Sequence, residues 1–336
     1  MSCQLGLRLA GFGNTKTENA MKTTHHLDPA SEVHAERLEA DPHYRILRAM
    51  PAPFASMPSD NGTPPDGRCL ALVDLETTSL DADLGAIIEI AVKLVWVDEA
   101  GQVLGHLPIY SWLEDPGHAL EPKIVQITGL RDEDLAGKRI DDEAVARLLD
   151  RADLVVAHNA RFDLPWIVRR WPQLADKAFA CSLREIDWSA LGFTDGHGLQ
   201  HLLHAHGWFS RAQHRAAADV WSLFWLLQQE RSDPVSQDGD ASDHSDHDET
   251  DRPVRTHLQR LLQASSAMTV KFLAVGAPYS MRNLLRARGY QWDAGPDRVW
   301  WREVAEADAE AEQIWLRRNG IVAPRCLPVS ARQRHR

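Results

Sequence analysis

The sequence is poor in cysteine and has no long apolar run. Its four cysteines are scattered along 336 residues: Cys3, Cys69, Cys181 and Cys326. No two of them form a CxxC pair, which argues against a structural zinc site and is typical of reduced thiols in a cytoplasmic protein. No stretch approaches the roughly 18 consecutive apolar residues of a membrane span, so a membrane is not expected as a partner. The mildly apolar segment 5–12 is short, interrupted by Arg8 and lacks a convincing cleavage site, so we do not interpret it as a signal peptide.

The sequence also lacks an overall basic excess, since its formal net charge is −11. The charge is unevenly distributed. Residues 231–251 contain eight acidic residues and one arginine with almost nothing apolar, a composition that predicts a disordered linker. From Arg252 onward, fifteen lysines and arginines outnumber seven acidic residues, giving a net charge of +8. The negative total therefore conceals a basic C-terminal region.

These shifts in composition predict five segments. They are an N-terminal extension (1–67) that is partly helical and ends in a proline-rich connector, a central domain (68–230), the acidic linker (231–255), a small basic α+β domain (256–327) and a basic tail (328–336). In the extension, residues 34–49 have helical character that Asp41-Pro42 interrupts. The small basic domain suits binding of nucleic acid or of a partner protein.

Four carboxylates and one histidine lie in three separated clusters of the central domain. Asp74 and Glu76 form the first cluster, Asp163 the second, and His214 with Asp219 the third. Hard divalent ions such as Mg²⁺ or Mn²⁺ prefer oxygen ligands. Two such ions about 3.5–4 Å apart can activate a water molecule and stabilise the leaving oxygen of a phosphodiester. A histidine with a pKa near neutrality suits the general base. The combination predicts a two-metal phosphodiesterase.

Local patterns support this grouping. Residues 69–75 are an apolar run that predicts a buried strand, and the strand period of two places Asp74 and Glu76 on one face at its end. Residues 154–157 predict a second buried strand, followed by a helix that carries Asp163. His214 and Asp219 are five residues apart, so on one helix they would flank a site about 140° apart. Alternatively, His214 lies just before the helix begins.

The three clusters resemble the motifs of the DEDDh 3′–5′ exonucleases, the family that includes the proofreading epsilon subunit of bacterial DNA polymerase III. The matching residues are Asp74-Leu75-Glu76-Thr77-Thr78, His158-Asn159-Ala160-Arg161-Phe162-Asp163 and His214-Arg215-Ala216-Ala217-Ala218-Asp219. The resemblance covers roughly residues 68–230 and implies a ribonuclease H-like fold. It implies that Asp74, Glu76, Asp163 and Asp219 bind two divalent metal ions and that His214 is the base. It also implies substrate contacts from Thr77, Thr78, Thr128, His158, Asn159 and Phe162.

The sequence departs from the family pattern at two places. Ser79 stands where the family commonly has glycine after the paired threonines, so the loop after the strand is expected to differ slightly. The segment that contacts the nucleotide is matched only loosely by residues 127–130, and some relatives have histidine in place of Thr128. Taken singly, the motifs also fit simpler roles: a solvated strand edge for Asp74 and Glu76, a helix cap for Asn159, and a surface histidine for His214.

Periodicity predicts the remaining elements of the central domain. Strands are expected at 69–75, 87–97 and 103–112, the last two joined by a turn at 98–101, and helices at 142–150, 162–170, 182–191, 199–206 and 216–229. Antiparallel strands followed by β/α alternation predict an α/β fold with a mixed sheet flanked by helices. In the basic domain we expect strands at 269–275 and 298–304 and helices at 280–288 and 305–318. Its arginines and tryptophans suit single-stranded nucleic acid, although most of the aromatic residues fit a small hydrophobic core.

The sequence therefore predicts a metal-dependent 3′–5′ exonuclease that releases 5′-mononucleotides from DNA 3′ ends, single-stranded ones above all. The resemblance raises a DNA polymerase or a repair factor as partner, but the C-terminus shows no sliding-clamp motif. Two alternatives stay open: an enzyme that trims RNA or degrades oligoribonucleotides, and a catalytically silent adaptor that binds nucleic acid. The five intact motif residues argue against the adaptor.

Overall fold

The computed structural model describes residues 28–58, 63–234, 252–295 and 297–336. The chain divides into two compact units, each assembled from two stretches of sequence. The first unit comprises Met1–Ala152 and Gly192–Gln229, and the second comprises Asp153–Leu191 and Glu230–Arg336. The predicted central domain thus contributes to both units. Within the described ranges, no helix combines the length and the apolar character needed to cross a bilayer.

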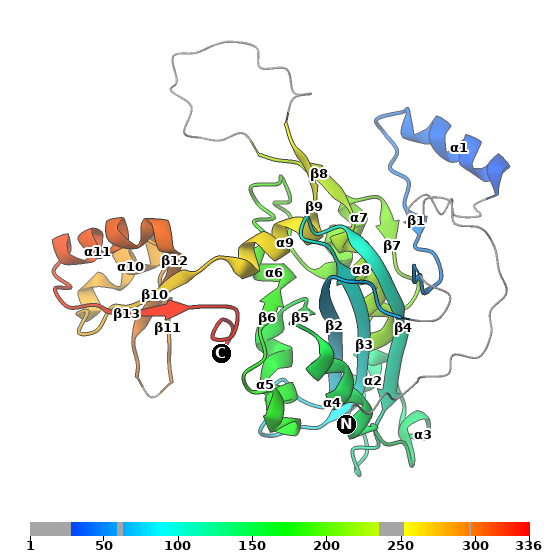
Figure 1. Cartoon of the computed structure of the whole chain (residues 1–336), viewed down its shortest axis with the longest axis horizontal. Coiled ribbons are helices and arrows are strands. Elements are labelled where there is room, and N and C mark those ends of the chain that lie inside the picture. The colour runs from blue at the N-terminus through cyan, green and yellow to red at the C-terminus, as the bar shows by residue number, and fades with distance from the viewer. Residues whose placement is uncertain (1–27, 59–62, 235–251, 296) are drawn as a thin grey trace. The chain divides into compact units, whose positions relative to one another are not determined.

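Three long antiparallel strands form the sheet of the first unit (Figure 1). They are β2 (Arg68–Thr77), β3 (Ile87–Val97) and β4 (Val103–Leu113). The middle strand β3 is buried along its whole length, as its apolar sequence requires. The Asp98 amide donates to the Gln102 carbonyl at 3.0 Å, and Gly101 has a φ of 77°, so the predicted turn joins β3 to β4. All three predicted strands are confirmed to within two residues at each end.

The other elements of the first unit surround this sheet. The helices are α1 (Pro29–Glu39), α2 (Pro122–Thr128), α3 (Asp132–Leu135), α4 (Asp142–Arg151), α7 (Leu199–Ala205) and α8 (Ala216–Leu227), and the short strands are β1 (Arg48–Ala49) and β7 (Trp208–Phe209). Helix α8 packs against β2, β3 and β4. Eight of its twelve residues are buried, because its sequence is apolar on nearly every side. The helices predicted at 142–150, 199–206 and 216–229 are confirmed.

The N-terminal extension differs from its prediction. Helix α1 ends at Glu39, and Arg48–Ala49 is instead strand β1, which pairs in parallel with β7. Proline disfavours the helical conformation of the residue before it, so Asp41-Pro42 ends the helix rather than merely interrupting it. Arg48 on β1 is held against α1 by ion pairs with Glu32 at 3.0 Å and with Glu39 at 2.6 Å.

A lysine is fully buried beside the sheet of the first unit. The Lys93 ammonium nitrogen lies 2.9 Å from Nδ1 of His106 and donates to the Leu107 carbonyl at 2.6 Å. It also lies over the rings of Trp221 and Phe224, 5.3 and 4.8 Å from their centroids. Burial lowers the pKa of Lys93 from 10.5 to about 7.

The low pKa of Lys93 makes the stability of the fold depend on pH. Above pH 7 the unfolded chain keeps a proton on this lysine that the folded chain releases, so the free energy of unfolding should rise by about 2 kcal/mol from pH 7 to pH 9. The variant Lys93→Met should lose this rise, whereas Lys123→Met, at an exposed position, should keep it. Urea denaturation at several pH values measures the difference. The same pH dependence in Lys93→Met and the parent protein would contradict the assignment.

The second unit begins with two parallel strands that are connected through a helix. Its elements up to residue 266 are β5 (Leu154–Ala157), α5 (Ala160–Arg170), the 3₁₀ turn η1 (Pro172–Leu174), β6 (Phe179–Cys181), α6 (Ser182–Glu185), β8 (Glu230–Ser232), β9 (Val254–Thr256) and α9 (His257–Ser266). The helix predicted at 182–191 is wrong beyond Glu185. The buried indole of Trp188 donates to the Ser182 carbonyl at 2.8 Å and so takes the acceptor that the next helical turn would need.

The basic domain is a four-stranded antiparallel sheet with helices on one face. Its elements are β10 (Thr269–Leu273), η3 (Tyr279–Met281), α10 (Arg282–Ala287), β11 (Gln291–Trp292), β12 (Trp300–Ala305), η4 (Glu306–Asp308), α11 (Ala309–Arg318) and β13 (Arg325–Val329), with strand order β11-β12-β10-β13. Leu285 and Leu316 from the helices share a core with Phe272, Tyr290 and Trp300 from the sheet. The predicted fold class, an α/β mixed sheet flanked by helices with a small α+β domain after it, is confirmed.

The ends of the predicted acidic linker are ordered. Strand β8 pairs antiparallel with β9, and Asp233 forms ion pairs with Arg255 at 2.6 Å and with Arg260 at 2.7 Å. The part of the predicted linker from 235 to 251 lies outside the described residues.

The predicted basic tail is also a packed segment. Arg334 is 6% exposed and forms ion pairs with Glu185 at 2.6 Å and with Glu303 at 3.0 Å. The Phe179 amide donates to the Ala331 carbonyl at 2.9 Å. Within the second unit, the C-terminal residues therefore join the basic domain to β6 and α6.

Candidate active site

The first acidic pair lies at the end of strand β2. Asp74 and Glu76 are half-buried, whereas Val73 before them and Leu75 between them are buried. This alternation follows from the two-residue period of a strand and places both carboxylates on the same face, as the sequence predicts.

Glu76 meets two residues of the third cluster. Ligand atoms of Glu76, His214 and Asp219 all lie within 4.8 Å of one another. His214 has a φ of 56° and precedes α8, whose N-cap is Arg215, so the alternative of a histidine just before the helix is confirmed. The Asp219 carboxylate accepts from the His214 amide at 2.9 Å and from the Gln200 side chain at 3.1 Å. These two bonds fix Asp219 beside the chain turn that carries His214.

The electrostatics of this cluster fit a cation. Burial raises the pKa of Glu76 to about 8, with a further rise from the neighbouring Asp219 and Glu89 carboxylates and an opposing effect of Arg215. Burial also raises the pKa of Asp219, and this rise is opposed chiefly by His214. Carboxylates that resist ionisation because they are crowded and desolvated are stabilised by a nearby positive ion. The two carboxylates offer the oxygen ligands that Mg²⁺ or Mn²⁺ prefers, and the imidazole beside them is free for a role in proton transfer.

A buried ion pair that the sequence reasoning missed holds the third motif. Glu89 of β3 has a side chain only 3% exposed, and it accepts from Arg215 Nε at 2.9 Å and from the Ala216 amide at 3.3 Å. Glu89 is also the cross-strand partner of Glu76. A glutamate inside the apolar run 87–97 was the available signal, because a charge in a buried strand needs a partner. The pair fixes the backbone directly after His214.

Loss of Arg215 should destabilise the fold more than loss of the Glu89 charge. Arg215→Ala leaves the Glu89 carboxylate buried and uncompensated, so the free energy of unfolding should fall by about 3 kcal/mol, the low end for a buried pair because Arg215 is half-exposed. Glu89→Gln keeps an acceptor and leaves Arg215 access to water, so its effect should be about 1 kcal/mol. Chemical denaturation gives both values, with Arg211→Ala at an exposed position as control. Equal losses of unfolding free energy in Arg215→Ala and Glu89→Gln would show that an uncompensated Glu89 carboxylate is not what destabilises the fold.

The second motif begins after β5 and runs into the first turn of α5 in the second unit. Asp163 is 2% exposed on α5, and Phe162 packs 6.3 Å from the Trp166 ring. Nδ1 of His158 lies 2.8 Å from the Ser182 hydroxyl. Asn159 is the N-cap residue of α5, with a φ of 84°, so the simpler interpretation as a helix cap holds for its position, although its side chain makes no cap hydrogen bond. Asparagine suits this place because it tolerates the left-handed region.

The threonines predicted to contact substrate are engaged in local bonds. The buried Thr77 hydroxyl donates to the Ser79 carbonyl at 2.6 Å, and the Thr78 hydroxyl accepts from the Ala86 amide at 2.9 Å. Thr128 is 4% exposed at the end of α2, and its hydroxyl donates to the Ile124 carbonyl at 3.0 Å. Ser79 does not have a positive φ, so this loop does not require the glycine of the family pattern.

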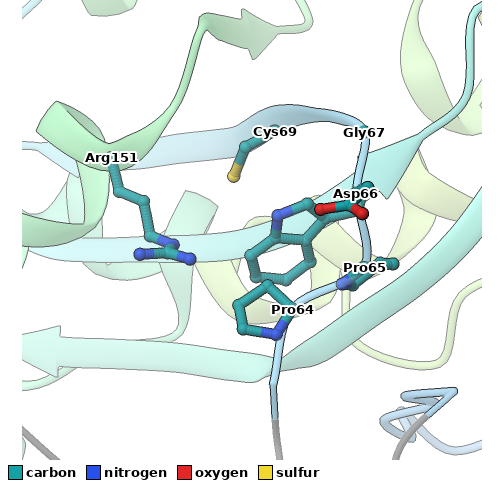
Figure 2. Close-up of a pocket in the computed structure, with 7 residues that line it drawn as sticks. Pro64, Pro65, Asp66, Gly67, Cys69 and Arg151 are labelled. Carbon is teal, nitrogen blue, oxygen red and sulfur yellow. The ribbon is translucent and has the colours of Figure 1, made fainter.

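A separate cavity lies at the opposite end of β2 (Figure 2). It has a volume of about 360 Å³ and is lined by Pro64, Pro65, Asp66, Gly67, Cys69, Trp96 and Arg151. Gly67 permits the close approach there, because a Cβ atom would lie 2.5 Å from the Val97 carbonyl oxygen. Cys69 and Glu76 are seven residues apart on the strand, about 23 Å. The cavity is therefore distinct from the acidic cluster.

Comparison with known proteins identifies the domain that carries these motifs. Residues 72–223 match the RNase_T family, described as exonuclease. This part of the chain is similar to the exonuclease family. The match bears out the predicted exonuclease class for this domain.

Individual relatives cover smaller shares of the chain. The DNA polymerase III PolC-type of Listeria welshimeri is 34% identical over 97 residues, which are 28% of this chain and 6% of that protein. The structure of exonuclease X in complex with 5′ overhanging duplex DNA is 24% identical and covers 46% of this chain and 86% of that one, with a TM-score of 0.35. The zinc-bound E. coli ExoI-ssDNA complex is 19% identical over 48% of this chain and 40% of that one, with a TM-score of 0.38. The exonuclease domain thus spans a small part of the polymerase that it matches.

Proposed function

We propose that the protein is a metal-dependent exonuclease that hydrolyses DNA from the 3′ end and releases 5′-mononucleotides. The observation that supports this most directly is the cluster of Glu76, His214 and Asp219 within 4.8 Å, inside a domain of the exonuclease family. The choice of DNA rests on the similarity to a DNA polymerase, and it makes repair or proofreading the natural setting. A polymerase or repair partner belongs to the same proposal, as does a cytoplasmic location, which the scattered cysteines support.

In this proposal, the four carboxylates and His214 would have different roles in the hydrolysis. Asp74, Glu76, Asp163 and Asp219 offer carboxylate oxygens to two divalent ions, Mg²⁺ or Mn²⁺. When bound, such ions activate water and neutralise charge on the leaving oxygen. The exposed His214 imidazole takes a proton from the attacking water, and solvent can then remove that proton. Asp219 and the Glu89–Arg215 pair hold the backbone of His214 in place for this step.

The proposal is tested by degradation of one single-stranded DNA labelled at either end. With Mg²⁺ or Mn²⁺, the 5′-labelled strand should give a ladder, the 3′-labelled strand should give a labelled mononucleotide at once, and EDTA should stop both. Asp163→Ala excludes a contaminating nuclease. An RNA strand of the same sequence decides between DNA and RNA as substrate, and faster loss of the RNA would favour the RNA-trimming alternative. Failure to cleave either polymer with any metal would refute the catalytic function and leave the adaptor.

A further inference from the structure

The basic domain contains an open cavity at one end of its sheet. The cavity has a volume of about 320 Å³ and lies between the turn at 274–277, which follows β10, and the β11–β12 hairpin. Trp292 on the hairpin is 49% exposed, and its ring centroid lies 5.4 Å from that of Trp300. The exposed Arg298 and Arg325 also line the cavity, together with one carboxylate, that of Asp297. The rim is therefore aromatic and carries two positive charges against one negative charge.

Packing of the core does not account for Trp292. Tyr290 and Trp300 are 3% and 8% exposed and belong to the core of this domain, which agrees with the structural interpretation of its aromatic residues. Trp292 instead packs one side against Trp300 and leaves about half of its surface in water, available to a ligand. An exposed indole beside arginines is the combination on which unpaired bases stack while their phosphates are neutralised.

From Arg325 at the cavity, one face of the sheet leads across all four strands; Trp292, the cross-strand partner of Trp300, lies on the other face. Arg325, Leu273, Trp301 and Gln291 are successive cross-strand partners on β13, β10, β12 and β11, so their side chains share one face. The Trp301 ring is contacted by Lys271 at 4.6 Å and by the guanidinium of Arg161 at 4.9 Å. Arg161 belongs to α5 and precedes the predicted metal ligand Asp163 by two residues. Within the second unit, Lys271, Trp301 and Arg161 thus connect the face that carries Arg325 to the second motif.

We propose that the cavity binds an unpaired base of single-stranded DNA, stacked on Trp292, with Arg298 and Arg325 neutralising the adjacent phosphates. This inference rests on the proposed function, because it concerns the strand whose 3′ end the exonuclease domain hydrolyses. The occupant is a single strand because paired bases are stacked within the duplex and present no free face to an indole. The net charge of +8 from residue 252 onward is complementary to that strand.

Binding is measured with the full-length chain in EDTA, so that no hydrolysis occurs. Fluorescence anisotropy of an oligothymidylate of about 20 nucleotides should show about tenfold weaker binding for Trp292→Ala, the loss expected for one stacked base. Trp292→Phe keeps an aromatic face and should restore most of the affinity. Since Trp292 is half-exposed, neither substitution should disturb the fold, which circular dichroism verifies.

The phosphate contacts of Arg298 and Arg325 are tested by the salt dependence of the binding constant. Arg298→Ala and Arg325→Ala should each reduce the slope of log K against log salt concentration by about 0.7, the value for one phosphate contact on a single strand. Arg318→Ala is the matched control, because Arg318 is exposed on α11 and does not line the cavity. An identical slope change in Arg318→Ala would show that only overall charge matters and would overturn the site.

Hydrolysis of a thymidine dinucleotide, compared with binding of the long strand, tests the cavity proposal and the proposed function separately. Unchanged hydrolysis of the dinucleotide by Trp292→Ala, together with weaker binding of the long strand, supports the cavity as a site apart from the chemistry. If the parent protein binds the long strand through Trp292 but hydrolyses neither substrate, the catalytic proposal fails and the cavity proposal stands. Equal affinity of Trp292→Ala and the parent protein, or a preference of the parent for duplex, overturns the cavity proposal.

Discussion

Replacement of Asp219 with alanine should lower the Mg²⁺-dependent hydrolysis of single-stranded DNA by about a thousandfold or more. A bound divalent ion contributes several kcal/mol to the stabilisation of charge in such a reaction, and each 1.36 kcal/mol corresponds to a factor of about ten. Asp219 is half-buried in the first turn of α8, and its ligand atom lies within 4.8 Å of those of Glu76 and His214, so alanine removes a carboxylate from the centre of the cluster. Single-turnover rates on a 5′-labelled strand measure the loss.

The structural role of Asp219 must be separated from metal binding. Asp219→Asn keeps one oxygen for the His214 amide and should preserve the unfolding midpoint while it still loses activity. Glu99→Ala removes a carboxylate from the exposed β3–β4 turn and serves as the matched control. Activity of Asp219→Asn close to that of the parent protein, at saturating Mg²⁺, would exclude Asp219 from the metal site.

Replacement of His214 with alanine should lower kcat by about 10²–10⁴-fold, the usual contribution of a general base, with little change in KM. The imidazole is exposed, and the structure holds His214 through its backbone amide, which an alanine retains. The metal ligands should therefore keep their positions in the variant. Steady-state kinetics on a labelled single strand give the two constants separately.

Added imidazole distinguishes a base from a structural histidine. Because the position is open to solvent, millimolar imidazole should restore part of the kcat of His214→Ala, with a pH profile that follows the pKa of free imidazole. His118→Ala, at an exposed site in the same unit, should behave as the parent protein does. An equal fall of kcat and affinity, without rescue, would assign His214 to binding rather than to proton transfer.

The sequence predicted those features of the site that depend on short-range geometry. The two-residue period of a strand is enough to place Asp74 and Glu76 together at the end of β2. An apolar helical pattern from residue 216 leaves His214 just before the helix, one of the two placements that the spacing allowed. The Glu89–Arg215 pair could not be found in this way, because 126 residues separate its partners. The resemblance implied a substrate contact from Thr128, but whether its hydroxyl faces solvent depends on the packing of α2, which motif matching does not describe.

Secondary structure was likewise predicted where it depends on a local repeat and missed where it depends on other contacts. Long strands such as β3 and long helices such as α8 are predicted almost to the residue, because many apolar positions repeat within them. Strand β6 has only three residues, too few for a period to be recognised, and it was missed. Helix α6 was predicted too long because the carbonyl that would continue it bonds to the indole of Trp188, a contact that helical propensity does not include.

The way in which the second unit is assembled bears on how this protein can evolve. Residues 153–191 carry the second motif, yet they make several of their contacts with residues beyond 230: Phe179 with Ala331, Glu185 with Arg334, Trp188 with His257 at 4.6 Å, and Arg161 with Trp301. Loss of the C-terminal region through a premature stop would leave Glu185 without its arginine and the Trp188 ring without its histidine. Selection that maintains the nuclease motifs therefore also acts on the basic domain that contacts them, and recombination cannot exchange the two parts freely.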